Sequence, residues 1–395
     1  MSENIMEPSS EPANAAEESP AAVQQKQEQK PVTVKPERMM SIDALRGFDM
    51  FWIVGGQGLV VAFLLLFSAS GELPAWLDYQ FSHVDWVGFS AWDLIMPLFL
   101  FISGASIPFA MHLKEGETRD YKAFYVRLAR RIALLWIFGM IAQGRLLTLD
   151  WTQFRFFSNT LQAIAVGYLI AVLAHLYLPT KGQIILFMDV LIIYWGLMMF
   201  VPVPGADGWT LEPRLNLALW LDDTILGRFR DGTTYAWILP GLGFAGSVML
   251  GVFSGMILRL KEAPMKRFAY LLGLGVACLV GGWLWSFHFP IIKHIWTSSM
   301  VLWAGGWSCL LLALFYLVID IWKFQRWAYP FMIIGANAIA AYMAEHLIPF
   351  KQLALLIPGL ACECPYAAFF ASFIAFMLLW IPLWIMYRYK IFLRV

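Results

Sequence analysis

Long runs of apolar residues, separated by short polar segments, dominate the pattern of this chain. A hydropathy scan with a window of about 19 residues finds ten such runs, and a helix of about 20 apolar residues is long enough to cross a bilayer. We expect transmembrane helices over residues 44–68, 91–111, 131–149, 159–178, 183–203, 236–258, 267–287, 299–320, 327–348 and 366–387. The pattern therefore predicts an all-α polytopic membrane protein with about ten transmembrane helices.

The polar segments predict how the chain is organised. Residues 1–38 are rich in Glu, Gln, Pro, Ala and Ser and have no apolar periodicity, which is typical of a disordered tail. We expect residues 39–395 to form one transmembrane domain. The longest loop between predicted helices, 204–235, divides them into two groups of five.

The positions of the charges predict the topology. An even number of spans puts both termini on one side, and most of the 28 Lys and Arg residues then lie on that side. By the positive-inside rule the N- and C-termini are cytoplasmic and the 204–235 loop is extracytoplasmic. The exceptions on the far side are Arg145, Arg155, Arg214, Arg228, Arg230, Lys293 and Lys351.

Composition narrows the function classes. The chain is 60% hydrophobic and 14% charged, with a mean hydropathy of +0.65, whereas a soluble domain has about 25% charged residues. A net charge of +1 is not the basic excess that is typical of a protein that binds nucleic acid. Four cysteines, two of them in apolar runs, do not make a disulfide scaffold. We find no phosphate-binding glycine loop and no metal-ligand spacing, so we expect no metal.

Polar side chains at membrane depth are functional candidates, because burying them is costly unless they are paired or hydrated. At the second span, His83 is followed by Asp85 and Asp93, two and ten residues later. This composition is typical of a general base oriented by a carboxylate. A structural histidine and a purely structural Asp93 are the alternatives. The first span contributes Asp43, Arg46, Asp49 and Gln57.

Three further groups have both a functional and a structural interpretation. Cytoplasmic arginines either bind an anionic ligand such as a nucleotide phosphate or only set the topology. Amides inside the bundle either line a polar tunnel or hydrogen-bond between helices. Extracytoplasmic polar residues suit a hydroxylated ligand, although helix capping explains part of them. The arginines are Arg127, Arg130 and Arg131; the amides are Asn159, Gln162 and Asn337; the extracytoplasmic residues are Lys293, His294, Trp296, Thr297, Ser298, Glu345 and His346.

Several motifs, in the same order over about residues 39–350, resemble the heparan-α-glucosaminide N-acetyltransferase family and its bacterial transmembrane acyltransferase relatives. They are Arg46-Gly47; His83-x-x-Trp86-x-Gly88, continuing to Asp93, Pro97, Phe99, Phe101 and Gly104; Leu161-Gln162-x-Ile164-Ala165; Leu250-Gly251-Val252-Phe253-Ser254-Gly255; Phe289-Pro290-Ile291 to Trp296-Thr297-Ser298-Ser299; and Ile334-Gly335-Ala336-Asn337-Ala338.

The resemblance implies a multi-pass enzyme of the bacterial inner membrane that passes the acetyl group of cytoplasmic acetyl-CoA to the amine of a glucosamine on the far side. It implies that His83 is catalytic and that Gln57 is its partner amide, where the family has Asn. Val87 and Ala163 are two further departures, which replace Asn and Arg. It also suggests a homodimer.

The resemblance further implies roles for the remaining candidates. The CoA nucleotide would lie at cytoplasmic cations such as Arg46 and Arg130, and the oxyanion would be stabilised by Gln57 with the amide of Asn337 or Gln162. Asp85 and Trp86 would join the extracytoplasmic group in contacting the acceptor. Direct attack in a ternary complex and an acetyl-His83 intermediate are both compatible with these residues.

Two other functions are compatible with the pattern. Ten helices in two groups of five with polar groups at the midplane also describe a secondary transporter for a sugar or amino sugar. An O-acyltransferase of an envelope polysaccharide would share the donor and the histidine.

Overall fold

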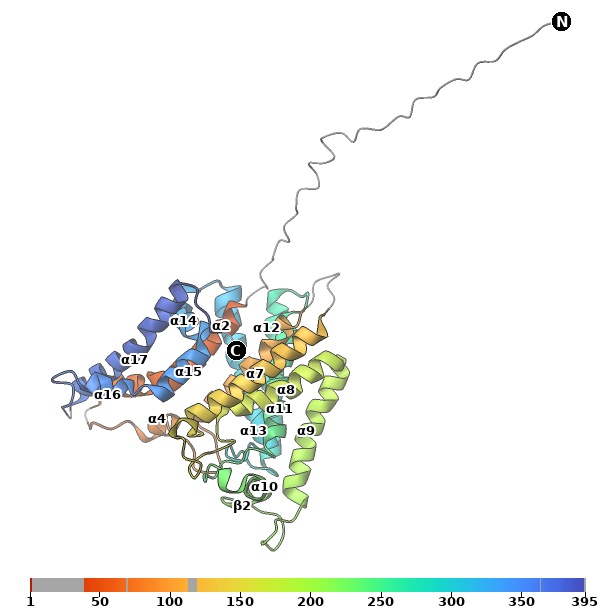
Figure 1. Cartoon of the computed structure of the whole chain (residues 1–395), viewed down its shortest axis with the longest axis horizontal. Helices are drawn as coiled ribbons and strands as arrows, with labels where there is room; N and C mark the ends of the chain where they lie inside the picture. The colour runs from red at the N-terminus through yellow and green to blue at the C-terminus, as the bar shows by residue number, and fades with distance from the viewer. Residues whose placement is uncertain (2–38, 69, 113–118, 363, 394–395) are drawn as a thin grey trace. The chain divides into compact units, whose positions relative to one another are not determined.

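The computed structural model describes residue 1 and residues 39–68, 70–112, 119–362 and 364–393. The tail predicted over 1–38 lies outside the described residues, apart from Met1. All the described helices and strands belong to the compact unit Glu37–Val395. They are α-helices with a few short 3-10 and π-helical segments, except for one antiparallel strand pair, β1 (Leu211–Glu212) and β2 (Leu215–Asn216). The prediction of an all-α polytopic membrane protein is confirmed (Figure 1).

Eight helices in the described part are long and apolar enough to cross a membrane. Three are composite. Met40–Leu65 joins α2 (Met40–Phe51) to α3 (Gln57–Leu65) through a π-helical turn, Ala91–Ala110 contains α5 (Ile95–Ala105) and α6 (Ile107–Ala110), and Ser298–Ile321 continues α13 (Ser298–Phe315) through a π-helical turn. The others are α8 (Thr160–Tyr177), α9 (Thr180–Phe200), α11 (Gly241–Leu258), α12 (Pro264–Ser286) and α17 (Pro365–Arg388).

Two more predicted spans have a different form. The 327–348 run is broken at Asn337 into α14 (Tyr329–Ala336) and α15 (Ala338–Leu347), which meet at a bend of 67° and make a ninth span if counted together. The 131–149 run overlaps α7 (Tyr121–Ala142), whose first half carries three arginines and which is therefore too charged to count as an apolar span. The count of ten spans and the side of the termini stay predictions.

Close helix crossings build the core. An added Cβ on Gly251 of α11 would lie 1.9 Å from the Phe101 carbonyl oxygen of α5, and one on Gly47 of α2 would lie 1.7 Å from the Phe331 carbonyl oxygen of α14. Only glycine permits backbones to approach this closely, as is common between membrane helices. Helix α11, the most buried span, therefore packs directly on α5, and α14 packs on α2.

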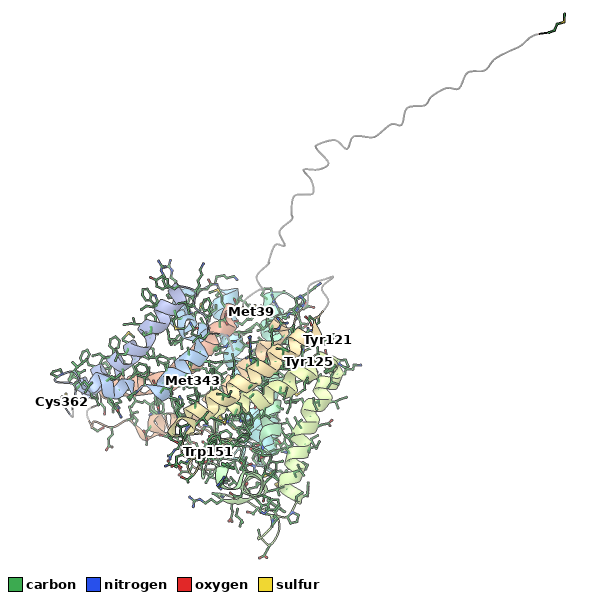
Figure 2. All side chains as sticks on the ribbon, viewed as in Figure 1. Met39, Tyr121, Tyr125, Trp151, Met343 and Cys362 are labelled. Carbon is green, nitrogen blue, oxygen red and sulfur yellow. The ribbon has the colours of Figure 1, made fainter. Side chains whose placement is uncertain are left out.

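Loops and short helices at the ends of the spans complete the unit. The predicted 204–235 loop contains the strand pair and α10 (Leu217–Leu226), which lie beside the lower end of α9 in Figure 1. The other short helices are α4 (Ala75–Gln80) and α16 (Phe350–Leu355). Helices α14 to α17 lie together on one side of the unit (Figure 1). Figure 2 labels Cys362 in the turn between α16 and α17, at the outer edge of this group.

A second, smaller hydrophobic core is formed between α10, the end of α9 and the segment that precedes α13. Its buried side chains include Tyr194 of α9 together with Phe289, Ile292 and Ile295 from the segment between α12 and α13. This core matters for function because it anchors the short segment 289–297, which carries Lys293.

Candidate active site

A cluster of three ionisable side chains joins His83, Asp93 and Lys293. His83 Nδ1 lies 2.8 Å from Asp93 Oδ1. Lys293 Nζ lies 3.1 Å from the same oxygen and 3.1 Å from His83 Nδ1. The His83 side chain is 50% exposed, whereas those of Asp93 and Lys293 are 1% and 7% exposed. The imidazole is thus held on one edge by a buried ion pair and is accessible on the other.

The carboxylate of Asp93 is fixed by the local fold. Ser90 and Asp93 form a capping box at the first turn of the 91–110 span. The second carboxylate oxygen accepts hydrogen bonds from the backbone N–H groups of Val84 and Ser90, each at 3.3 Å, and lies 3.1 Å from the Ser90 hydroxyl. Because both oxygens have partners, Asp93 can orient the imidazole through Nδ1 and leave Nε2 as the base.

Lys293 reaches this cluster through backbone contacts between two distant loops. Val87 forms an isolated antiparallel bridge with Ile292, and the Gly88 N–H donates to the Ile291 carbonyl at 2.9 Å. Burial lowers the pKa of the Lys293 ammonium below its usual value, and the Asp93 carboxylate opposes this shift. The ion pair with Asp93 is what makes a buried cation tolerable here.

A cavity of about 880 Å³ opens beside the exposed edge of His83. Its volume falls within the range of roughly 300 to 1,000 Å³ found for small-molecule sites. The lining comes from the ends of α7 and α15, the starts of α5 and α8, the segments that precede α5, α8, α11 and α13, and Ile53 of the first span. Its ionisable and hydroxyl side chains are His83, Lys293, Arg145, Arg155, Ser158, Thr160, Asp231, Thr233, Tyr235, Tyr342, Glu345 and His346. Such a wall can hydrogen-bond a hydroxylated ligand.

Several of these lining residues were not singled out from the sequence. Arg145 and Arg155 were visible only as two of the few cations on the far side, and Asp231 and Thr233 lie in the long loop. Asp231 accepts hydrogen bonds from the Thr233 backbone and hydroxyl and from the Trp237 indole. No spacing signal identifies them, because distant loops bring them together.

Two residues that were predicted to contact the acceptor sugar, Trp86 and His294, contact other protein groups near the cluster. Trp86 donates its indole N–H to the Leu211 carbonyl at 2.9 Å and contacts the edge of the His294 ring. His294 stacks on Tyr235 with ring centroids 4.1 Å apart, and its Nδ1 lies 2.7 Å from the Thr234 hydroxyl. Burial lowers the pKa of His294 to about 4, with the Lys293 charge as the next cause.

The residues that follow His294 are buried. Trp296 donates to the Ser247 hydroxyl, Thr297 caps α13, and Ser298 donates to the Leu191 carbonyl. Asp85 is exposed in the loop after His83. Whether these residues contact an acceptor stays a prediction.

The predicted amides Gln57, Gln162 and Asn337 each have protein partners, as does Asn159, which donates to Gln143 and to the Tyr342 hydroxyl. Gln57 donates to the Phe81 carbonyl at 2.7 Å, which anchors the loop that carries His83. Gln162 accepts from the Ser158 N–H and donates to the Phe156 carbonyl. Asn337 donates to the Ile391 carbonyl and accepts from the Leu393 N–H. Their role toward CoA or an oxyanion stays a prediction.

The predicted CoA-binding cations lie at the start of the 40–65 span and in the first half of α7. Arg46 donates to Asp43 at 2.9 Å and to the Ser106 hydroxyl at 2.7 Å. Arg127 and Arg130 are exposed. The guanidinium of Arg131 lies 4.1 Å from the centre of the Tyr168 ring, and its buried Nε has no hydrogen-bond partner among the described residues. The exposed guanidinium groups of Arg127 and Arg130 fit the phosphates of a nucleotide.

Two curated proteins are similar to this chain over most of its length. Heparan-alpha-glucosaminide N-acetyltransferase of Homo sapiens is 25% identical over 382 residues, which cover 80% of this chain and 54% of the human protein. The Mus musculus protein of the same name is 25% identical over 425 residues, which cover 91% of this chain and 61% of the mouse protein. The similarity supports a family relationship. The chain spans less than two thirds of either relative, and no protein-family model matches it.

Proposed function

We propose that this chain is a transmembrane acetyltransferase. It transfers the acetyl group of cytoplasmic acetyl-CoA to the amine of glucosamine, or of a glucosamine-ended glycan, on the extracytoplasmic side of a bacterial inner membrane. The observation that carries the proposal is His83, held by the buried carboxylate of Asp93 at 2.8 Å and open to a cavity of about 880 Å³. Similarity to two N-acetyltransferases supports the same reaction class.

His83 is the general base. A protonated glucosamine amine is not a nucleophile, so one proton must first leave for solvent. The neutral amine then attacks the thioester carbonyl carbon, and Nε2 of His83 takes the second proton as the N–C bond forms. The C–S bond breaks, and the CoA thiolate leaves and is protonated from the His83 imidazolium or from water. Asp93 stabilises the imidazolium during this step and keeps its own charge.

The remaining roles belong to the same proposal. Gln57 holds the His83 loop through one amide N–H, and its other N–H is a candidate donor to the oxyanion. The CoA nucleotide binds at Arg46, Arg127, Arg130 and Arg131. The polar wall of the cavity, including Glu345 and His346, holds the sugar hydroxyls. Direct attack in a ternary complex is our preferred scheme, since the two substrates arrive from opposite sides.

The proposal is tested with the purified chain in detergent, with acetyl-CoA and glucosamine. Thiol release and N-acetylglucosamine formation are followed for the wild type, His83→Ala and His288→Ala. We expect amine-dependent turnover that falls by about 100- to 10,000-fold in His83→Ala and stays unchanged in His288→Ala, since His288 is exposed and lies outside the cavity lining.

A different result overturns the proposal. If the wild type releases no CoA with any amino sugar, N-acetyl transfer is excluded, and polysaccharide acceptors and uptake into liposomes distinguish O-acyl transfer from transport. Equal loss in both histidine variants would show that His83 has no special role. Acetyl-labelled protein that forms without acceptor in the wild type alone would replace direct attack by an acetyl-His83 intermediate.

A further inference from the structure

Two of the four cysteines lie together in the turn between α16 and α17, at the edge of the unit where Figure 2 labels Cys362. Cys362 is exposed and Cys364 is half-buried. Both are free thiols, and their Sγ atoms lie 2.6 Å apart in a hydrogen bond. The other two, Cys278 and Cys309, are buried in α12 and α13 at 6% and 0% exposure. The proposed acetyl transfer uses none of the four.

The two thiols of this pair have different environments. Cys364 is the N-cap of α17, a helix of 24 residues, and the free N–H groups and the dipole at a helix N-terminus stabilise a negative charge. The hydrogen bond from Cys362, followed by the Ala367 N–H, lowers the pKa of the Cys364 thiol. The same hydrogen bond raises the pKa of the Cys362 thiol. Cys364 therefore ionises first, and Cys362 keeps its proton beside the thiolate.

Contact between two accessible thiols, one of which ionises readily, is the arrangement that thiol–disulfide exchange requires. The sulfurs are already in contact, so the backbone does not have to move to join them. A structural role does not explain the pair, because a bond between residues two positions apart closes a short loop, and a disulfide stabilises a fold mainly by closing a long one. The predicted topology places this turn on the extracytoplasmic side, where disulfides form and persist.

We propose that Cys362 and Cys364 form a redox pair, which passes between a dithiol and an intramolecular disulfide by exchange with an external organic disulfide. The Cys364 thiolate attacks one sulfur of that disulfide, whose S–S bond breaks and releases one thiolate. The Cys362 thiol then loses its proton and attacks Cys364 Sγ in the mixed disulfide, and the second external thiolate leaves. The protein dithiol is oxidised and the external disulfide is reduced to two thiols. An excess of external thiol reverses both steps, and neither step depends on acetyl transfer.

The test follows the thiols of the full chain in lipid nanodiscs at neutral pH, in buffers that range from reduced to oxidised glutathione. Accessible thiols are then blocked with N-ethylmaleimide without denaturant, and the intact mass counts the maleimide and glutathione groups on the chain. We expect two maleimide groups in reduced glutathione and neither group in oxidised glutathione, with full return on reduction. The buried Cys278 and Cys309 should stay unlabelled throughout. This comparison requires no variant, so it does not depend on how a substitution affects folding.

Cys362→Ser and Cys364→Ser each leave one thiol of the pair without the other. Because the mixed disulfide cannot be resolved, we expect one glutathione on each variant in oxidised glutathione, whereas the wild type carries none. The thiol that remains in Cys362→Ser should react about two- to fivefold faster than the one that remains in Cys364→Ser, since the N-terminus of α17 stabilises its thiolate. The double variant Cys362→Ser/Cys364→Ser is the control, and it should carry neither group in any buffer.

Several results would overturn the proposal. They are two free thiols on the wild type in oxidised glutathione, a glutathione adduct on the wild type like that on the single variants, covalent dimers on a non-reducing gel, and a disulfide that reduced glutathione does not open. Equal rates for the two single variants would overturn the assignment of Cys364 as the attacking thiol.

Discussion

Replacing Asp93 by asparagine removes the charge that links His83 to Lys293. The substitution preserves the size of the side chain, so it tests the charge and the hydrogen bonds rather than the packing. Two consequences are expected, one for stability and one for activity, and they can be measured separately.

The stability effect follows from Lys293. Its side chain is 7% exposed and its ion pair with Asp93 is 3.1 Å long, so Asp93→Asn leaves a buried cation without a counter-charge. Breaking such a pair from one side costs about 3 to 5 kcal/mol. Asp93→Asn/Lys293→Met removes both charges. Because non-ionic groups often replace a buried pair without loss, we expect the double variant to regain most of that stability.

The activity effect follows from the tautomer of His83. Asparagine can offer an N–H to His83 Nδ1 in place of a carboxylate oxygen. The imidazole then carries its proton on Nε2, and it cannot accept one from the amine. We expect kcat to fall by about 100- to 10,000-fold in Asp93→Asn. Lys293→Met does not correct the tautomer, so the double variant stays inactive although it is stable.

The assay combines thermal unfolding in detergent with CoA release in the presence of glucosamine for the wild type, both single variants and the double variant. Stability without activity in the double variant is the expected pattern. A double variant that regains activity would show that Asp93 serves only as the counter-charge of Lys293. An Asp93→Asn protein with wild-type stability and wild-type rate would refute both parts of the reasoning.

Three further predictions concern stability. Gly47→Ala should lower the free energy of unfolding by about 1 to 3 kcal/mol, because its Cβ would lie 1.7 Å from the Phe331 carbonyl oxygen. Gly58→Ala on the same span is the control, because a Cβ there would have nothing within 4 Å. Equal melting temperatures for the two variants would contradict this prediction. The pKa of His294 is lowered to about 4, so its contribution to stability is present above its usual pKa of 6.5 and is lost as pH falls toward 4. As pH rises from 4 to 6.5, the melting temperature of the wild type should therefore increase relative to that of His294→Asn. Burial raises the pKa of Asp222 to about 6, so its contribution to stability is present below its usual pKa of 3.8 and is lost as pH rises through 6. The difference in melting temperature between the wild type and Asp222→Asn should therefore shrink over this range. If the differences for His294→Asn and Asp222→Asn changed with pH in the same direction, both signs would be refuted.

Most of the fold could be predicted from apolar runs, because a bilayer-spanning helix needs only length and hydrophobicity. The exceptions have tertiary causes. The 327–348 run contains a proline, Pro330, but that residue lies in the first turn of α14 and the helix breaks seven residues later, at Asn337. The side-chain amide of Asn337 forms hydrogen bonds with residues 391 and 393. Helix α10 in the 204–235 loop is ten residues long, which is too short for a window of about 19 residues.

The site was predictable only in part, for a similar reason. His83 and Asp93 lie ten residues apart, and a loop that leads into a capped helix brings them together. Lys293 was expected to contact a ligand, and its place beside both residues could not be predicted. It depends on the bridge between Val87 and Ile292, a long-range backbone pairing that no residue spacing encodes.

The hydrogen bonds between the Asn337 side chain and the segment after α17 have a consequence for biosynthesis. The side-chain N–H of Asn337 donates to the carbonyl of residue 391, and its side-chain oxygen accepts from the N–H of residue 393. Both residues follow α17. These partners leave the ribosome more than fifty residues after Asn337, when α14 and α15 have already been made. The bend between these two helices is therefore completed after translation of α17, and removing residues 391–393 should leave earlier spans inserted while exposing the α14–α15 junction to proteolysis.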